Sequence, residues 1–234
     1  MDQFSKPTYS EKVARLITQR IKNGKLRGGT SISEASIAEE CGISRAPVRE
    51  ALHHLEAEGL LMSHPKRGKC VTLLTSDDIR HNYELSAALE GTAAEKAADG
   101  LPEETKKKLA SLIESMREAL EKDSTFDEHA HLGTQFHETI LTLSDNPLLR
   151  SLASRFSRVI SKYLMYQYWR TLYTPAELFD RHNRIYEALC NGSREQIRQA
   201  IAEHYAESAE RLTQFCDSRA PEASGKKAPH FPEE

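Results

Sequence analysis

The sequence of 234 residues lacks any long apolar run, and no stretch approaches the ~18 consecutive apolar residues that a membrane-spanning helix needs. Its amino terminus, MDQFSKPTYSEK, also lacks the charged-then-apolar pattern of a secretion signal. Cysteine is scarce, and the absence of any CxxC pair argues against a disulfide framework or a zinc finger. We therefore expect a cytoplasmic chain without a membrane partner, whose reduced cysteines serve as small apolar side chains. They are Cys41, Cys70, Cys190 and Cys216.

Overall the chain has little net charge, formally −3, but its charges are unevenly distributed. Residues 1–73 hold 12 Lys and Arg against 8 Asp and Glu, a balance of +4. The remaining residues hold 20 against 27, a balance of −7. This asymmetry is typical of an anion-binding module joined to a second domain, and a chain of this length with 38% hydrophobic residues can form two modest domains.

The basic first third of the chain carries the pattern of a helix-turn-helix. Residues 10–22 have apolar side chains at helical spacing and end in the breaker run NGKLRGG. A short helix is expected over 33–40, Gly42 interrupts it, and a further helix begins at Ser44 and stops at Gly59. The apolar runs LLMS and CVTLL then predict a β-hairpin whose tip holds the basic turn HPKRGK.

The helix over SRAPVREALHHLEAEGL presents two arginines four residues apart. At the helical period Arg45 and Arg49 share one face, opposite an apolar set, so both point outward. Ser44 is predicted to cap this helix, and Pro47 is tolerated in its first turn. Exposed arginines often only solvate a helix, but the basic hairpin that follows favours guanine recognition in the major groove of DNA. The predicted DNA-binding residues are Ser44, Arg45, Arg49, Lys66, Arg67, Gly68 and Lys69.

The rest of the chain is predicted to be helical, because strand signals disappear and apolar residues recur at intervals of three and four. We predict six helices, near 76–98, 102–122, 126–144, 147–170, 174–191 and 193–215. The tail PEASGKKAPHFPEE has three prolines and no apolar period, so disorder is expected there. The expected fold class is mainly α. It comprises a winged helix-turn-helix with a hairpin wing over 1–73, an all-α six-helix bundle over 74–216 and a disordered tail over 217–234.

Three histidines, His137, His182 and His204, fall on the apolar sides of three different predicted helices. A single histidine in such a place is commonly a satisfied core residue. Three neutral imidazoles packed together differ, because their lone pairs lack donors unless water or a cation takes them. Three nitrogens with open coordination positions suit Zn²⁺ or Ni²⁺. The residues alone leave both readings open, core histidines or ligands of a divalent ion.

An aromatic cluster, YLMYQYWRTLY, lies at the end of the fourth predicted helix. Aromatic side chains are common in cores and dimer interfaces, which is one reading of the cluster. The other is that part of it lines a small-molecule pocket in the bundle, where an arginine pairs with an acidic ligand. The residues predicted for this effector pocket are Tyr163, Tyr166, Trp169 and Arg170.

The segment ISEASIAEECGISRAPVREALHHLEAEGLLMSHPKRGKCVTLL resembles the winged-helix domain of GntR-family transcription regulators, in which SRxPVREAL is a specific signature. The helical remainder is similar to the FCD effector domain of the FadR-type subgroup, so the resemblance spans most of the chain. It implies that Arg45, Arg49, Arg67 and Gly68 contact DNA. Where such relatives place an arginine in the second helix this chain has Ala35, so one base or phosphate contact is expected to be absent.

The same resemblance implies a metal site, since many FCD domains bind a metal ion through one aspartate and three histidines. The histidine positions match His137, His182 and His204, whereas the aspartate position is Gly133. Without that anionic ligand we expect weaker binding of a divalent ion, unless water, an effector carboxylate or a neighbouring side chain fills the position. Those neighbours are Glu128, His129 and His131. Ser86 stands where the family has an arginine, so a changed effector pocket is expected.

These observations predict a ligand-responsive transcription regulator. A homodimer is expected on a palindromic DNA operator, because one recognition helix contacts too few bases for specificity. A small metabolite, which the resemblance implies is an organic acid, is expected to bind the helical domain and modulate the affinity for DNA.

A metal-dependent enzyme built on the three histidines is the competing hypothesis. It lacks a companion acid–base pair, since Glu138 projects about 100° away from His137 on the same helix, so we predict no enzymatic activity. A third hypothesis is a winged helix used only for protein contacts.

Overall fold

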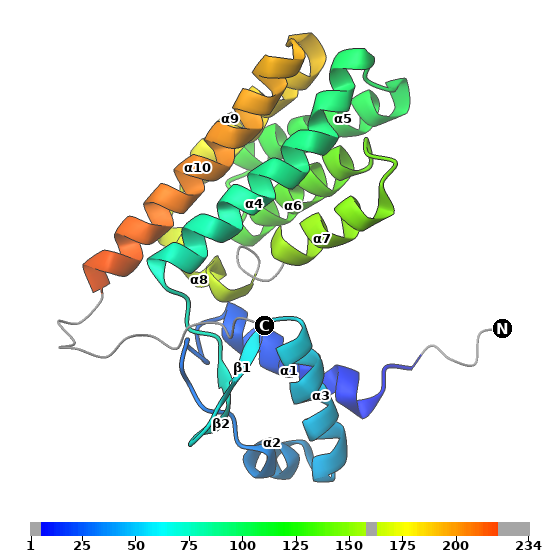
Figure 1. The fold of residues 1–234 in the computed structure, drawn as a ribbon. Helices are drawn as coiled ribbons and strands as arrows, with labels where there is room; N and C mark the ends of the chain where they lie inside the picture. Colours follow the sequence, from blue (N-terminus) through cyan, green and yellow to red (C-terminus); the bar gives the residue numbers. More distant parts are fainter. Residues whose placement is uncertain (1–5, 158–162, 220–234) are drawn as a thin grey trace. The chain divides into compact units, whose positions relative to one another are not determined.

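The computed structural model describes residues 6–157 and 163–219 (Figure 1). The contacts divide the chain into two compact units. The first contains Met1–Leu73 and Ser154–Thr171, and the second contains Leu74–Ala153 and Leu172–Glu234. None of the described helices is both long and apolar enough to cross a membrane.

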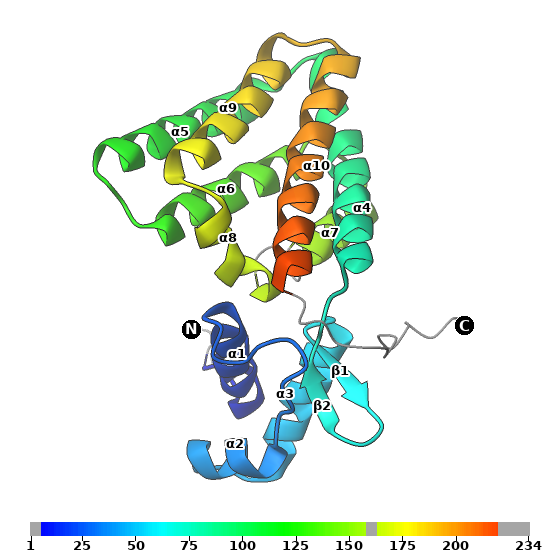
Figure 2. The same ribbon diagram turned by 90° about the vertical axis from the view of Figure 1, so that its left-hand side faces the viewer.

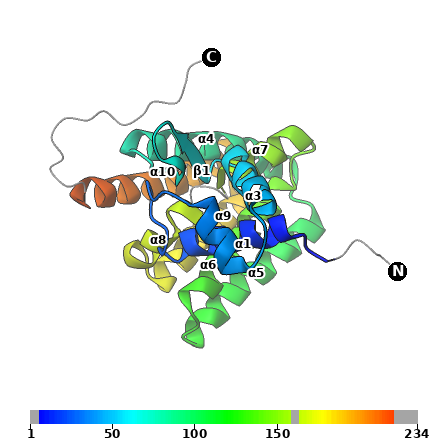
Figure 3. The ribbon, with the colours of Figure 1, turned by 90° about the horizontal axis from the view of Figure 1, so that it is seen from below.

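Three helices and a hairpin form the main part of the first unit, as the sequence predicts. Their bounds are α1 Tyr9–Lys22, α2 Glu34–Cys41, α3 Arg45–Ala57, β1 Leu61–His64 and β2 Gly68–Val71. Helix α1 begins with a capping box between Thr8 and Glu11, and α2 ends at Gly42, whose φ of 64° suits glycine. Helix α1 packs against α3 (Figures 1 and 3) through apolar side chains. The most buried of these are Ile17, Ile21, Val48, Leu52 and Leu55.

The hairpin is a two-stranded antiparallel sheet in which Leu61 pairs with Val71 and His64 with Gly68. Its inner side chains, including Leu61 and Val71, are buried, and a single bridge joins Ser31 to Cys70. Residues 65–67 form the turn, so the basic tip lies at the far end of the two strands. Helix-turn-helix followed by hairpin is the winged helix-turn-helix arrangement, and this part of the predicted fold is confirmed.

Helices make up the rest of the described chain. Their bounds are α4 Ser76–Ala94, η1 Glu95–Asp99, α5 Glu103–Glu121, α6 Phe126–Leu141, α7 Pro147–Ser157, α8 Tyr166–Leu172, α9 Pro175–Asn191 and α10 Arg194–Arg219. Helix α10 runs alongside α4 (Figures 1 and 2), and α5, α6 and α9 pack together. Tyr83, Phe136, Leu109 and Ile185 are among the fully buried side chains of this core.

The predicted six-helix count is wrong for this region. The single helix expected over 147–170 is two helices, α7 and α8, with residues 158–162 outside the described residues. Helix α8 begins at Tyr166, so Tyr166, Tyr168 and Trp169 of the aromatic cluster lie within it. Helix α10 continues to Arg219, beyond the predicted end at 215, so residues 217–219 of the expected disordered tail are helical and that part of the prediction is wrong. The rest of the expected tail, 220–234, lies outside the described residues.

Candidate nucleic-acid interface and candidate metal centre

Helix α3 presents its arginines as the sequence predicts. Arg45 and Arg49 are exposed, while Val48 and Leu52 on the opposite face are fully buried in the first unit. Ser44 occupies the N-cap position, but its side chain makes no capping hydrogen bond. The expected side-chain cap is therefore absent. The exposed Ser44 hydroxyl and the first amides of α3 remain available to an anion such as a DNA phosphate.

Only some of the basic residues predicted for the wing lie at its tip. Lys66 and Arg67 are exposed in the turn, and Gly68 begins β2 with a φ of 69°, which glycine adopts without strain. A Cβ added at Gly68 would meet no atom within 4 Å, so the backbone there is open to a close approach. Lys69 instead turns toward α3, where its ammonium binds Glu56 and lies 2.9 Å from the Ser63 hydroxyl. That contact ties the wing to α3.

The three predicted histidines meet in the second unit. His137 comes from α6, His182 from α9 and His204 from α10. One ligand nitrogen from each lies within 4.8 Å of the others, and the ring centroids are 4.8–5.2 Å apart. His182 and His204 are buried, and His137 is partly buried. The expectation that the three side chains converge is confirmed.

Hydrogen bonds fix which nitrogens carry lone pairs. The His137 Nδ1–H donates to Glu90 Oε1 at 2.6 Å, and the His182 Nδ1–H donates to the Leu178 carbonyl at 2.6 Å. Each bond leaves Nε2 as the ring nitrogen with a free lone pair, the arrangement in which histidine binds metals. The buried Nδ1 of His204 has no hydrogen-bond partner among the described residues. A buried nitrogen without a partner is costly, and a bound cation would satisfy it.

Burial keeps the inner two imidazoles uncharged. It lowers the pKa of His182 to about 3, with a smaller contribution from neighbouring His137. Burial also lowers the pKa of His204 well below its ordinary value, and the charge of Arg181 acts in the same direction. Both rings are therefore neutral at physiological pH, which is the protonation state that a metal ion requires of histidine.

Glu90 is the anionic partner of the histidine cluster. Its side chain is 2% exposed and accepts a second hydrogen bond, at 2.6 Å, from the Tyr205 hydroxyl. Burial and the nearby carboxylate raise the pKa of Tyr205 well above its ordinary value, so the phenol stays protonated and can donate this hydrogen bond. A histidine that donates to a carboxylate is a stronger metal ligand, because the carboxylate raises its basicity.

Gly133 lies directly against the cluster. A Cβ added at Gly133 would lie 2.9 Å from His182 Nε2 and 3.0 Å from its Cε1. The backbone of α6 at this point therefore faces the nitrogen of His182 that carries the lone pair. Ser86, on α4 one turn before Glu90, is buried. The three nitrogens fit a divalent transition ion with open positions, and residue 133 supplies no ligand.

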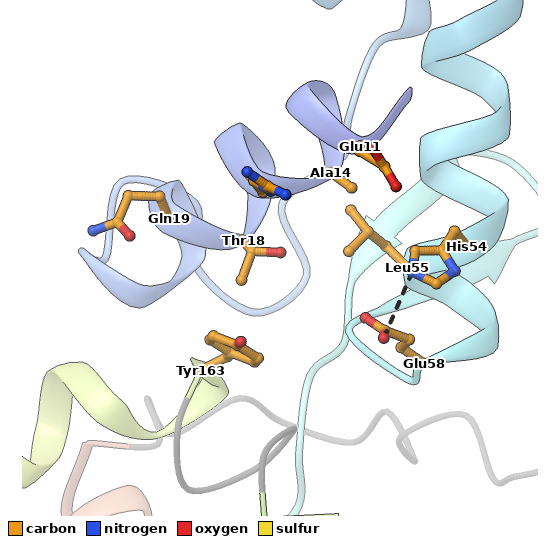
Figure 4. A pocket seen from close by; sticks show the side chains of 9 residues that line it. Glu11, Ala14, Thr18, Gln19, His54, Leu55, Glu58 and Tyr163 are labelled. Carbon is orange, nitrogen blue, oxygen red and sulfur yellow. Dashed lines mark ion pairs between the residues drawn. The ribbon is translucent and has the colours of Figure 1, made fainter. Parts of the chain in front are cut away.

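The predicted effector-pocket residues belong to the first unit, whereas the three histidines belong to the second. Tyr163 lines a pocket of about 440 Å³ together with α1 and α3 (Figure 4), where His54 Nε2 lies 3.6 Å from Glu58 Oε1. Tyr166 is buried with its ring under the Lys22 ammonium, and Trp169 is partly buried. Arg170 is exposed. Their role in effector binding stays a prediction.

One buried charge near the histidines was missed from the sequence. Arg181 is 3% exposed, and its Nη2 donates to the His204 carbonyl at 2.5 Å and to the Ser208 hydroxyl at 2.7 Å. Its guanidinium lies 4.4 Å from the centre of the Tyr173 ring. The sequence held a signal, because Arg181 follows buried Leu178 by three residues and therefore shares its side of α9.

Two family models match the chain. Residues 9–71 match the bacterial regulatory proteins of the gntR family, and residues 81–207 match the FCD domain. The uncharacterized HTH-type transcriptional regulator YdhC of Bacillus subtilis is 29% identical over 215 residues, which cover 91% of this chain and 96% of the relative. The gluconate operon transcriptional repressor of Bacillus subtilis is 27% identical over 206 residues, covering 86% and 84%.

A solved structure supports the same fold. The structure of E. coli McbR/YncC matches with a TM-score of 0.70 at 22% sequence identity, covering 90% of this chain and 100% of that one. The relatives identified by sequence are transcription regulators, not enzymes.

Proposed function

We propose that this chain is a DNA-binding transcription regulator controlled by an anionic metabolite and a metal ion. The chain belongs to the GntR family of bacterial regulators and carries an FCD domain. The family and its relatives establish the DNA-binding regulator. The contacts to DNA, the dimer, the ion and the metabolite are the proposed parts. The observation that carries them is the pairing of outward arginines on α3 with a buried histidine cluster in the helical unit.

Arg45 and Arg49 would contact base edges in the major groove. A guanidinium can bridge guanine O6 and N7, and such a bidentate contact discriminates by about 1–3 kcal/mol. Ser44 and the amino end of α3 would bind a phosphate, and Lys66, Arg67 and Gly68 of the wing would contact the backbone or the minor groove. Lys69 would act through its contact with Glu56, which holds the wing against α3.

A homodimer would double this contact set. One recognition helix covers a few base pairs, and two related by symmetry contact the two halves of a palindromic operator. Two exposed leucines one turn apart on α7, Leu148 and Leu152, are 65% and 37% exposed and would be buried if this face joins two copies.

His137, His182 and His204 would hold a divalent ion such as Zn²⁺ or Ni²⁺. The lone pairs on Nε2 of the first two rings and the unpartnered Nδ1 of His204 support this assignment. The ion, when bound, supplies a Lewis-acidic positive charge with coordination positions open to an outside ligand. Because Gly133 gives no carboxylate, an effector carboxylate would complete the donor set.

The proposed effector is an organic acid, with sugar acids as the first class to test. The similar repressor from Bacillus subtilis is named for a gluconate operon, and gluconate is a sugar acid. By linkage, an effector that changes operator affinity has its own affinity changed by the same factor when DNA is bound.

The first experiment measures metal content on protein purified without chelator and without a nickel column. One ion per chain is expected in the wild type and none in a folded variant with His137, His182 and His204 all replaced by alanine. Replacing His53, His54 and His64 of the first unit is the matched control, which removes three histidines without touching the cluster. A wild type that stays empty when zinc or nickel is added contradicts the metal site.

The second experiment tests DNA binding by fluorescence anisotropy with duplexes selected from a random-sequence pool. Arg45→Ala with Arg49→Ala is expected to abolish selective binding. The matched control, Arg80→Ala with Arg117→Ala, removes the same charge from exposed positions of the second unit and leaves selectivity unchanged. Unchanged DNA selectivity in the first double variant contradicts the proposed contacts.

A further inference from the structure

Arg49 of the recognition helix is held by a carboxylate of the preceding helix. Its Nε lies 3.2 Å from both carboxylate oxygens of Glu34, and its Nη2 lies 3.0 Å from Oε2. Glu34 is the first residue of α2, fifteen positions before Arg49. The pair is a two-point contact along one side of the guanidinium, which fixes the plane of the group as well as its position.

The contact leaves the end of the guanidinium open. Arginine has five N–H donors in a rigid fork, and Glu34 binds the side made by Nε and Nη2. The outer side, made by Nη1 and the second hydrogen of Nη2, points away from the carboxylate. Two parallel donors on that outer side are what guanine O6 and N7 require. Glu34 can therefore remain bound while Arg49 contacts a base.

Holding Arg49 has a benefit for selectivity and a cost for affinity. The Arg49 side chain is 59% exposed, and an exposed arginine loses rotamer freedom when it is fixed. Glu34 removes part of that loss before DNA arrives. Against this, a carboxylate close to the recognition face repels phosphates and lowers binding to any DNA sequence. Arg45 and His53 lie close enough to act on Glu34 as well.

Glu34 is ionised when the protein meets DNA. The hydrogen bond from Arg49 is the main cause that lowers the pKa of Glu34 below its ordinary value, and the charge of Arg45 acts in the same direction. A neutral acid would bind Arg49 weakly, so the ionised form is the one that can orient it.

We propose that Glu34 is a positioning residue for DNA recognition, which holds the guanidinium of Arg49 in the orientation that selects guanine and does so at the expense of sequence-independent affinity. The inference rests on the proposed function, because it requires Arg49 to contact a base. It assigns to Glu34 a part in specificity that differs from a role in helix α2 itself. An acidic residue at the first position of a helix stabilises the helix dipole whatever lies nearby.

The test compares the base preferences of variants by selection from a random-sequence duplex pool, followed by anisotropy titrations with the selected duplex and with a scrambled one. Arg49→Ala identifies the position in each half-site at which Arg49 selects guanine. Glu34→Gln is expected to lower the guanine preference at that same position by about 3- to 10-fold, a part of the full bidentate discrimination. Affinity for the scrambled duplex is expected to rise, because one negative charge is removed.

Glu34→Asp separates positioning from charge. It keeps the charge and the acid at the start of α2 but withdraws the carboxylate by one methylene group. We expect the same loss of guanine preference without the gain in affinity for scrambled DNA. Glu39→Gln, at an exposed position on α2, is the matched control and is expected to leave the preference at that position unchanged. Thermal unfolding of each variant confirms that it is folded.

Each other outcome counts against the proposal. A preference that Arg49→Ala loses but both Glu34 variants keep overturns the role of Glu34 and leaves the proposed function standing. A changed preference at a different position shows that Glu34 contacts a base itself. Selectivity that survives Arg49→Ala overturns the base contact of Arg49, and the positioning role falls with it.

Discussion

At the scale of single residues, Gly133 has the largest consequence for chemistry. A Cβ added at Gly133 would lie 2.9 Å from His182 Nε2, and the family resemblance expects an aspartate at this position. We predict that Gly133→Asp binds Zn²⁺ more tightly than Gly133→Ala, because both variants carry the Cβ that crowds His182 and only the aspartate adds an anionic ligand to the three neutral nitrogens. Competition with a chromophoric chelator measures the affinity. Gly133→Ala is the control, since it adds the Cβ that crowds His182 without adding a ligand, and it is expected to weaken binding. Equal affinities in all three proteins contradict this assignment.

Glu90 influences the histidine cluster through its hydrogen bond with His137 Nδ1. We predict that Glu90→Gln lowers zinc affinity about 10- to 100-fold, because an amide orients the ring but no longer raises its basicity. Tyr205→Phe is the comparison, since it removes only the hydrogen bond to Glu90 Oε2 and leaves the carboxylate charged. We expect a smaller effect from it. Isothermal titration with zinc measures both, and an unchanged affinity in Glu90→Gln contradicts the proposed effect of the carboxylate on His137.

At the scale of elements, α9 is fixed at its start by a capping box. The Thr174 hydroxyl accepts from the Glu177 amide at 3.2 Å, and the Glu177 carboxylate accepts from the Thr174 amide at 2.8 Å. We predict that Thr174→Ala lowers the free energy of unfolding by about 1 kcal/mol. Urea denaturation measures the loss. Thr92→Ala, which removes a hydroxyl within α4, is the control and is expected to cost less. An equal loss in the two variants shows that the cap is not a special contact.

The same capping box gives α9 a pH-dependent contribution. Hydrogen bonds from the Thr174 amide and from Arg211 lower the pKa of Glu177 from 4.5 to about 2. Because the folded-state pKa is depressed, the stabilisation is fully present above pH 4.5 and is lost as the pH falls toward 2. We predict that the stability difference between wild type and Glu177→Gln shrinks as the pH is lowered through this window. Urea titrations across the window measure it. A difference that stays constant with pH contradicts the prediction.

The sequence predicted correctly those features of the helices that follow from the spacing of apolar residues. The period that buries Val48 also exposes Arg49, and the apolar faces that carry His137, His182 and His204 must meet if three helices pack together. Pairings between polar side chains were not predicted. Arg49 binds Glu34 and Lys69 turns to Glu56 across loops whose paths local spacing does not specify.

The division of 147–170 into two helices was missed for a related reason. Apolar spacing continues from α7 into α8, so the period alone gives no sign of an interruption.

At the scale of the whole molecule, the proposed function requires two copies. We predict that light scattering on the purified protein gives a mass near twice the chain mass of 26.4 kDa. Leu148→Asp with Leu152→Asp places two charges on the exposed face of α7 and is expected to shift the protein toward the monomer. Leu73→Asp, at another exposed leucine, is the control and leaves the mass unchanged. A dimer that both variants preserve shows that copies meet through a different surface.

Linkage gives a further prediction for the intact regulator. If zinc changes the affinity for the selected duplex by some factor, saturating duplex must change the affinity for zinc by the same factor. Anisotropy titrations with and without zinc measure the first, and zinc competition with and without duplex measures the second. The triple histidine-to-alanine variant is expected to show neither effect. Zinc-dependent DNA binding that persists in this variant places the responsive site elsewhere.

The missing carboxylate at Gly133 also determines what kind of signal the proposed regulator reports. A site with an aspartate of its own would hold its metal ion more tightly, so its occupancy would depend less on the metabolite. Three neutral imidazoles hold an ion less firmly, and an incoming acid then stabilises the ion as much as the ion stabilises the acid. If either the metal ion or the acid is scarce, the site would stay empty. In the proposed function the site would therefore be filled only when metal ion and acid are both present, and gene control would depend jointly on metal supply and carbon supply.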